Sequence, residues 1–211
     1  MVNFLTEDEK KCVSASVAAA ELKTSGEIVP MIVRRSSMIG HVFPQLFSLL
    51  IIFTLFFRIF LEQYYHELHY DWIMLAGLMM SAPMAFWLQR FSWVQRVMTP
   101  VLDREFEVFE RAKLEFYESN IHKTKGDTGI LIFISLMEHQ CVVLAGESIA
   151  SKMPKDTWDK VVGLAVGGIK NKKAADGLVA AIELCGQILS EHFPVQNGDK
   201  NELPNAVVLK E

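Results

Sequence analysis

Four carboxylates lie where the sequence predicts the ends of strands or the starts of helices, and they are the residues best suited to hold a divalent cation. They are Glu147, Asp156, Asp159 and Asp176. Hard cations such as Ca²⁺ and Mg²⁺ prefer several oxygen ligands that converge on one point. In open α/β sheets, ligands bind beyond the carboxyl ends of the strands. These residues therefore predict a Ca²⁺ or Mg²⁺ site.

Three of these four carboxylates also have a structural interpretation. Asp156 and Asp159 lie at the predicted start of a helix, where the helix dipole alone favours a negative charge. Asp176 lies near the start of another predicted helix and can simply face solvent. Glu147 follows a predicted strand and has no such explanation. It is therefore the leading candidate ligand.

The sequence contains no motif for covalent catalysis or nucleotide binding. A GxSxG elbow, an HExxH pair, a Walker loop and a GxGxxG fingerprint are all missing. The three cysteines, Cys12, Cys141 and Cys185, are far apart in the sequence and form no CxxC pair. This spacing argues against a thiolate zinc site and a disulfide-stapled secreted fold, and it fits a reducing compartment. A hydrolase built on this chain would need a cation to activate water.

The composition excludes a nucleic-acid binder that works through bulk positive charge. The chain has 211 residues, of which 21 are basic and 25 acidic, and its formal net charge is −4. Apolar residues make up 51% of the chain and are concentrated in two segments. Residues 42–57 carry no charge, the apolar run continues past Arg58 to residue 61, and residues 72–88 are again uncharged.

These two segments predict a transmembrane hairpin over residues 42–88, with spans over about 42–61 and 71–88. Both are apolar on all sides, whereas a surface helix has a polar face. A helix of about 20 residues crosses the hydrocarbon layer of about 30 Å, and about 17 residues is the lower limit. The alternative is a pair of buried core helices.

Flanking charges predict the orientation of this hairpin. The connecting loop contains no Lys or Arg, whereas five arginines flank the outer ends: Arg34, Arg35, Arg90, Arg96 and Arg104. Basic residues favour the cytoplasmic side of a membrane. We therefore expect a two-span protein of the inner (plasma) membrane with both termini in the cytoplasm. Arg58, near the loop end of the first span, is expected to reach outward to the headgroups.

The residues outside the hairpin predict one α/β domain made of residues 1–41 and 89–194, followed by a loose C-terminal tail over residues 195–211. Thr6 and Glu9 form a capping-box pattern that opens a helix. Strands are predicted over residues 27–33, 129–135 and 141–145, the last two joined as a hairpin.

Three residues of these strands carry further predictions. Pro30 lacks an amide donor, which predicts that the first strand lies at the edge of the sheet or carries a bulge. Glu27 opens that strand, and Glu138 lies in the tight turn of the hairpin. Both glutamates are predicted to lie at the surface.

Three stretches together resemble the TPM domain, the thylakoid-lumen-phosphatase-like family. FLTEDEKKCVSASVAAAELKTSGEIV resembles the family's opening helix and its T-x-G-E-I-V entry into the first strand. TGILIFISLMEHQCVVLAGESI resembles the central hairpin with its Glu-containing turn. DTWDKVV and IKNKKAADGLVAAIELCGQILSEHFP resemble the closing helices, with a Trp, a Gly-Leu pair and a terminal His-Phe-Pro. Their order and spacing make the match specific. With the hairpin inserted between the first strand and the second helix, the chain resembles a membrane-inserted branch of the family.

The resemblance implies an α/β fold, a three-layer αβα sandwich with a small sheet that is here interrupted by the transmembrane helical hairpin. Some members bind divalent cations in loops beyond the strand ends. Acid phosphatase activity is attributed to some members, and others assemble or repair membrane complexes. This chain departs from the pattern after the second hairpin strand, where many members have Asp and it has Gly146 followed by Glu147.

Two functions follow as hypotheses. The first is a non-catalytic, membrane-anchored interaction or assembly module at the cytoplasmic face, tuned by a divalent cation, with the lipid bilayer and another membrane protein or complex as partners. The second is a divalent-metal-dependent phosphatase with Glu147 among its ligands. The change at Gly146 weakens the case for a metal site and for hydrolysis, so the first hypothesis is favoured.

Overall fold

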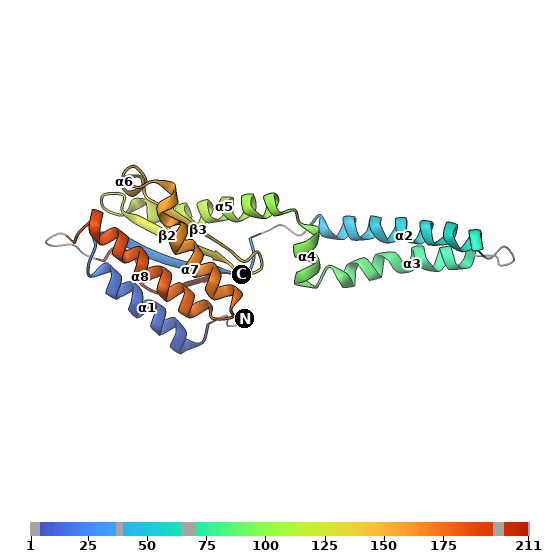
Figure 1. Cartoon of the computed structure of the whole chain (residues 1–211), viewed down its shortest axis with the longest axis horizontal. Helices are drawn as coiled ribbons and strands as arrows, with labels where there is room; N and C mark the ends of the chain where they lie inside the picture. Colours follow the sequence, from blue (N-terminus) through green and yellow to red (C-terminus); the bar gives the residue numbers. More distant parts are fainter. Residues whose placement is uncertain (1–4, 37–39, 65–70, 196–200, 211) are drawn as a thin grey trace. The chain divides into compact units, whose positions relative to one another are not determined.

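The chain forms two compact units in the computed structural model (Figure 1). One unit comprises residues 1–36 and 105–211, and the other comprises residues 37–104. The structure describes residues 5–36, 40–64, 71–195 and 201–210.

The larger unit is mixed α/β and is built on a small four-stranded sheet. The strands are β1 (Glu27–Val33), β2 (Gly129–Ser135), β3 (Gln140–Ala145) and β4 (Val208–Lys210). Their order in the sheet is β3-β2-β1-β4. β1 pairs in parallel with both β2 and β4, whereas β2 and β3 are antiparallel. The predicted strand positions and the β2–β3 hairpin are confirmed.

Helices of this unit account for most of its remaining ordered chain. They are α1 (Glu7–Glu21), α5 (Val101–Glu118), η1 (Ile121–Lys123), α6 (Glu147–Ala150), η2 (Lys155–Trp158), α7 (Asp159–Lys170) and α8 (Ala174–His192). The first four residues of α5 belong to the second unit. α1 begins as predicted, because the Thr6 hydroxyl accepts from the Glu9 amide while the Glu9 carboxylate accepts from the Thr6 amide.

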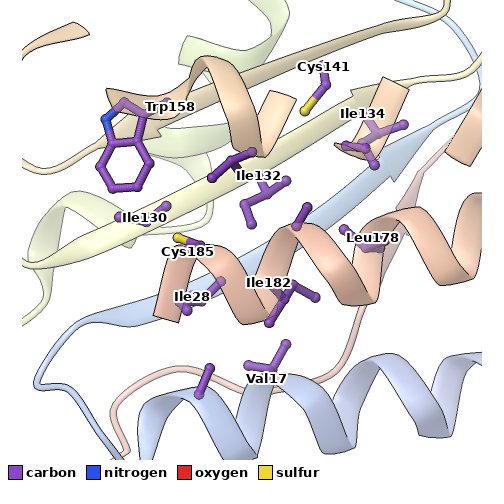
Figure 2. Packing of buried hydrophobic residues seen from close by; sticks show 14 of the residues in the cluster. Val17, Ile28, Ile130, Ile132, Ile134, Cys141, Trp158, Leu178, Ile182 and Cys185 are labelled. Atoms are coloured by element: carbon purple, nitrogen blue, oxygen red, sulfur yellow. The ribbon is translucent and has the colours of Figure 1, made fainter. Parts of the chain in front are cut away.

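Side chains on the two faces of the sheet enter separate cores, because successive residues of a strand point to opposite faces. Ile28 of β1 and Ile132 of β2 pack with residues of α1, α7 and α8. Figure 2 shows this core, in which Ile130 of β2 lies near Cys185 of α8 and Ile134 of β2 near Leu178 of α8. On the opposite face, the alternate residues of β1 and β2 pack against α5 and η1.

Pro30 lies at an edge position although its strand is partly internal. The Glu27 amide donates to the Thr128 carbonyl on the β2 side, and the Ile28 amide donates to Glu21 Oε1 on the other side. This alternation directs the Pro30 nitrogen away from β2. In the described part of the chain, β4 pairs with β1 only at Met31–Val33. The edge prediction therefore holds for the first half of β1 and is wrong for the second half.

The C-terminal segment differs from the predicted loose tail. Residues 208–210 form β4, and the Arg34 amide extends the pairing by donating to the Lys210 carbonyl at 3.3 Å. On the side of β1 that faces away from β2, the backbone groups of its second half need hydrogen-bond partners, and β4 supplies them. The apolar side chains of Val208 and Leu209 pack against the two cores. A polar composition upstream, in residues 195–205, concealed this short apolar strand.

The second unit consists of α2 (Val42–Tyr64), α3 (Asp71–Leu88) and α4 (Ser92–Met98). The predicted spans match α2 and α3. The two helices approach closely at Gly77, where a Cβ atom would lie 2.6 Å from Thr54 Cγ2. This unit extends to Arg104, beyond the predicted hairpin boundary at residue 88, because α4 packs on the hairpin.

Both α2 and α3 are long and apolar enough to cross a membrane. The mean hydropathy of their most apolar stretches is 2.0 and 1.3, and only 11% of each stretch is buried. Core helices of a soluble protein are mostly buried, so the alternative of two buried core helices does not fit this unit. Large apolar side chains such as Phe53, Phe56 and Met79 face outward.

Candidate functional site

The four predicted metal ligands lie at helix starts and are all exposed. Glu147 is the first residue of α6, Asp156 lies in η2, Asp159 is the first residue of α7, and Asp176 lies in the first turn of α8. Among the described residues, no three His, Cys, Asp or Glu side chains form a group that could hold a metal ion. The structure therefore does not bring the four carboxylates together as one ligand set. A negative charge at the start of a helix is favoured by the helix dipole.

Gly146 is required by the backbone that surrounds it. A Cβ atom at this position would lie 2.2 Å from the carbonyl oxygen of Asp127, closer than any real Cβ contact. The Gly146 amide also donates to the Gly129 carbonyl at 2.8 Å, which holds the end of β3 against the start of β2. An aspartate, the residue that the resemblance leads one to expect here, does not fit this conformation.

Glu138 is buried, and the prediction that it lies at the surface is wrong. Its side chain and that of Ser135 are both within the protein, with Glu138 only 3% exposed. The Ser135 hydroxyl donates to Glu138 Oε2, and the Ser36 amide donates to Glu138 Oε1 at 3.2 Å. The Ser36 hydroxyl donates to Ser135 Oγ at 3.0 Å. These three side chains fasten the chain after β1 to the β2–β3 turn.

Glu27 is also buried, which corrects the second surface prediction. Its side chain is 8% exposed and accepts hydrogen bonds from the amides of Glu202 and Leu203, at 3.1 and 3.4 Å. Both donors belong to the segment that leads into β4. Glu27 therefore ties the C-terminal segment to the start of β1.

A pocket of about 290 Å³, called the hollow below, lies beside Glu27 and is lined in part by polar side chains. Its lining includes Glu21 of α1, Thr24, Asn201 and Asn205. Burial raises the pKa of Glu21 to about 7, and the nearby Glu27 carboxylate acts in the same direction. Hydrogen bonds to Glu21 from the Ile28 amide and from Asn205 oppose this rise in pKa.

This hollow supplies carboxylate, amide and hydroxyl oxygens of the kind that hard cations accept. Glu21 Oε1 already accepts from a backbone amide at 2.9 Å, and both oxygens of Glu27 accept from Glu202 and Leu203. The carboxylates are thus engaged in holding the C-terminal segment. Glu21 can exchange a proton near neutral pH, because its pKa is close to 7.

No signal in the sequence could have located this hollow. Its lining residues come from α1, from the start of β1 and from the C-terminal part of the chain, where they are Val195, Asn201 and Asn205. Glu21 and Glu27 are only six positions apart, but their common burial depends on the C-terminal segment that covers them.

In the second unit, Arg58 pairs with carboxylates at the loop end of the hairpin. Its Nη2 lies 3.3 Å from Glu62 Oε1 and 3.3 Å from Asp71 Oδ1. Its Nη1 also contacts the sulfur of Met74. The prediction for Arg58 named lipid headgroups as its neighbours, and the structure shows that it has two acidic neighbours within the protein.

Comparison with known proteins gives a likeness of fold. No protein-family model matches the chain, and no curated protein matches it. A solved structure, the NMR structure of the BA42 protein from the psychrophilic bacterium Bizionia argentinensis, superposes with a TM-score of 0.63 at 20% sequence identity. The match covers 100% of this chain and 98% of that chain. At this identity the likeness concerns the fold alone.

Proposed function

We propose that this protein is a membrane-anchored, non-catalytic interaction or assembly module of the TPM-domain type. Its α/β unit would be held at the cytoplasmic face of the inner (plasma) membrane, and its partner would be another membrane protein or complex. The observation that carries the proposal is the division of the chain into an α/β unit and a separate unit of exposed apolar helices.

The fold proposed for the α/β unit is a three-layer αβα sandwich. Apolar side chains on one face of the sheet pack with α1, α7 and α8, and those on the other face pack with α5. This arrangement supports the sandwich that the TPM resemblance implies.

Membrane insertion is supported by the outward-facing apolar surface of α2 and α3. Burying apolar surface away from water stabilises a protein by about 25 cal/mol per Å², and the hydrocarbon layer supplies that environment for a two-helix hairpin. All backbone groups of a helix are satisfied internally, so both helices can cross this layer. The first test is extraction of cell membranes with alkaline carbonate, which leaves integral proteins in the pellet. Recovery in the soluble fraction would contradict the anchor.

The proposed orientation can be tested with cysteine labelling. Cys12 is exposed on α1, whereas Cys141 and Cys185 are buried, so a membrane-impermeant maleimide should react with the native protein only at Cys12. We expect labelling of Cys12 only after the cells are permeabilised. In a Cys12→Ser, Gln63→Cys variant, whose new thiol lies at the loop end of α2, labelling should occur in intact cells. The opposite pattern would invert the topology.

The proposal assigns a non-catalytic role, and the phosphatase is its alternative. The four exposed carboxylates form no group of three within the described chain, and we find no specific observation that favours hydrolysis. A phosphoester assay with added Mg²⁺ or Ca²⁺ tests the alternative directly. Metal-dependent turnover that Glu147→Gln abolishes, while Glu183→Gln at an exposed position of α8 leaves it intact, would replace this proposal with the phosphatase.

Cation binding and partner binding need separate measurements. Titration of the purified protein with Ca²⁺ or Mg²⁺ should shift the amide resonances of residues near Glu147 if a cation tunes the module. Affinity purification from solubilised membranes should recover a second membrane protein in fixed ratio. Loss of the α/β unit should abolish that recovery while the hairpin still inserts.

A further inference from the structure

Helix α4 lies across the end of the α2–α3 hairpin rather than alongside it (Figure 1). Val94 is buried and Met98 half-buried against Val42, Leu46 and Ala85, which form the base of the hairpin. If α2 and α3 run across the membrane, a helix that lies crosswise at their ends runs along the membrane surface.

Polar contacts fix α4 in this position. The side-chain amide of Gln95, itself buried, donates to the Gln89 carbonyl at 2.6 Å and so closes the turn from α3 into α4. At the other end of α4, the Thr99 hydroxyl donates to the Gln95 carbonyl at 2.9 Å and lies 3.2 Å from His41 Nε2, next to the start of α2. The orientation of α4 is therefore set by contacts with the end of α3 and the start of α2, both at the base of the hairpin.

Two large apolar side chains of α4 remain outside this packing. Trp93 is 66% exposed and Val97 is 70% exposed. They are four residues apart, so they lie on the same side of the helix. An exposed tryptophan beside an exposed valine costs free energy in water, because both present apolar surface. Contact with an apolar surface would remove this cost.

The charges around α4 are mostly positive. Residues 89–104 contain Arg90, Arg96 and Arg104 against a single carboxylate, Asp103. Arg90 is exposed, and its guanidinium lies 4.9 Å from the centroid of the Phe86 ring at the end of α3. Tryptophan and basic residues together are characteristic of helices that lie in the headgroup region of a membrane.

We propose that α4 is an interfacial anchor that lies in the headgroup layer of the cytoplasmic leaflet, with Trp93 and Val97 in contact with lipid and Arg90 beside the lipid phosphates. The inference rests on the proposed membrane anchor. Lipid is the occupant because α4 packs on the base of α2 and α3, whose apolar surfaces are exposed, and because the surrounding arginines match anionic headgroups. A helix of this kind buries its apolar face about 5–10 Å into the boundary between headgroups and acyl chains.

Lipid quenching of tryptophan fluorescence tests the proposal. The full chain would be prepared with Trp93 as its only tryptophan, through Trp72→Phe, Trp87→Phe and Trp158→Phe. It would be reconstituted into vesicles of phosphatidylcholine and phosphatidylglycerol whose acyl chains carry bromine near the carbonyl end or near the methyl end. We expect Trp93 emission to be blue-shifted and quenched more strongly by bromine near the carbonyl end.

Two matched single-tryptophan variants serve as controls. Trp87, exposed near the end of α3, should be quenched by brominated lipid whenever the hairpin inserts. Trp158, buried in the core of the α/β unit, should not be quenched. If Trp87 is quenched and Trp93 is not, the hairpin is inserted and the α4 proposal is wrong. If neither is quenched, the membrane anchor itself fails, and the α4 proposal fails with it.

Quenching by aqueous iodide shows whether Trp93 lies in water or against protein instead of lipid. Quenching by iodide without quenching by lipid would place Trp93 in water, and protection from both would place it against protein. Either result overturns the proposal.

A second label guards against misfolding of the tryptophan variants. A nitroxide attached at Val97→Cys in a Cys12→Ser background should collide with membrane-soluble oxygen more often than with a water-soluble nickel chelate. The same label on native Cys12 should show the reverse preference. A preference for the nickel chelate at position 97 would also overturn the proposal.

Discussion

The ammonium group of Lys210 on β4 donates a hydrogen bond to the completely buried carboxylate of Glu115 on α5. The second oxygen of that carboxylate lies 2.7 Å from Arg111 Nη2. This contact connects the last strand of the chain to the helix that covers one face of the sheet. It holds the short strand β4 in place in addition to the backbone pairing of its three residues.

Replacing Lys210 by Met should lower the free energy of unfolding by about 1–3 kcal/mol, because the buried Glu115 carboxylate loses a charged donor. For a chain of this size, 1 kcal/mol corresponds to about 2–4 °C in the midpoint of thermal unfolding. The measurement is thermal unfolding in detergent. The matched control is Lys113→Met, whose pair with Glu110 at 2.8 Å is exposed and worth under about 1 kcal/mol. Equal effects of the two substitutions would show that the Lys210 contact contributes little.

The raised pKa of Glu21 makes stability depend on pH. In the folded protein this carboxyl group, with a pKa of about 7, stays protonated when the unfolded chain, with a value near 4.5, has lost its proton. The folded state therefore binds more protons between these two values, and its stability falls as the pH rises from about 4.5 to 7. The loss is complete about one pH unit above the folded pKa of about 7.

Glu21→Gln should remove this pH dependence, because the neutral amide imitates the protonated carboxyl group. We expect the variant to gain stability over the wild type progressively between pH 5 and pH 7, by an amount on the order of 1 kcal/mol, since solvent partly screens this side chain. Thermal midpoints of both proteins across that range provide the test. Glu183→Gln, at an exposed position of α8, should show no such trend. A constant difference between wild type and Glu21→Gln would refute the linkage.

Gly146→Ala should destabilise the protein by about 1–3 kcal/mol, because the new methyl group meets the Asp127 carbonyl oxygen. Gly163→Ala on α7 is the matched control, since a Cβ atom there has open space. The control should stabilise the protein by about 0.5–1 kcal/mol, because alanine loses less backbone entropy in a helix. Thermal or denaturant unfolding distinguishes the two signs. A stable Gly146→Asp variant would mean that this loop adapts to a side chain.

Ser135→Ala should cost about 1–3 kcal/mol, because it removes a hydroxyl donor from the buried carboxylate of Glu138. It also removes the acceptor of the Ser36 hydroxyl. Hydrogen exchange of the amides at the ends of β1 and β2 should accelerate in this variant. Ser151→Ala provides the control, since the Ser151 hydroxyl donates to a local carbonyl at an exposed site, and its effect should stay within about 0.5 kcal/mol. Unchanged hydrogen-exchange rates of the amides at the strand ends would show that Ser135 does not hold the segment after β1 to the β2–β3 turn.

Features that depend on neighbouring residues could be predicted from the sequence. The capping box of Thr6 and Glu9 and the β2–β3 hairpin follow from short patterns. The positions and lengths of α2 and α3 could be predicted from the two uncharged, apolar segments of the sequence. A helix surrounded by hydrocarbon needs apolar residues on all its sides. Glu147 follows a strand end with one residue between them, as the sequence predicts, but its position does not by itself gather other ligands.

Tertiary structure alone decided which carboxylates are buried and where the C-terminus lies. Glu27 is enclosed because the amides of Glu202 and Leu203, 175 and 176 positions away, donate to it. Residues 208–210 form a strand by pairing with the backbone amides and carbonyls of the second half of β1. The sequence determined the local elements of this protein through periodicity and capping. Burial of charge depends on donors distant in the chain, and no local pattern specifies them.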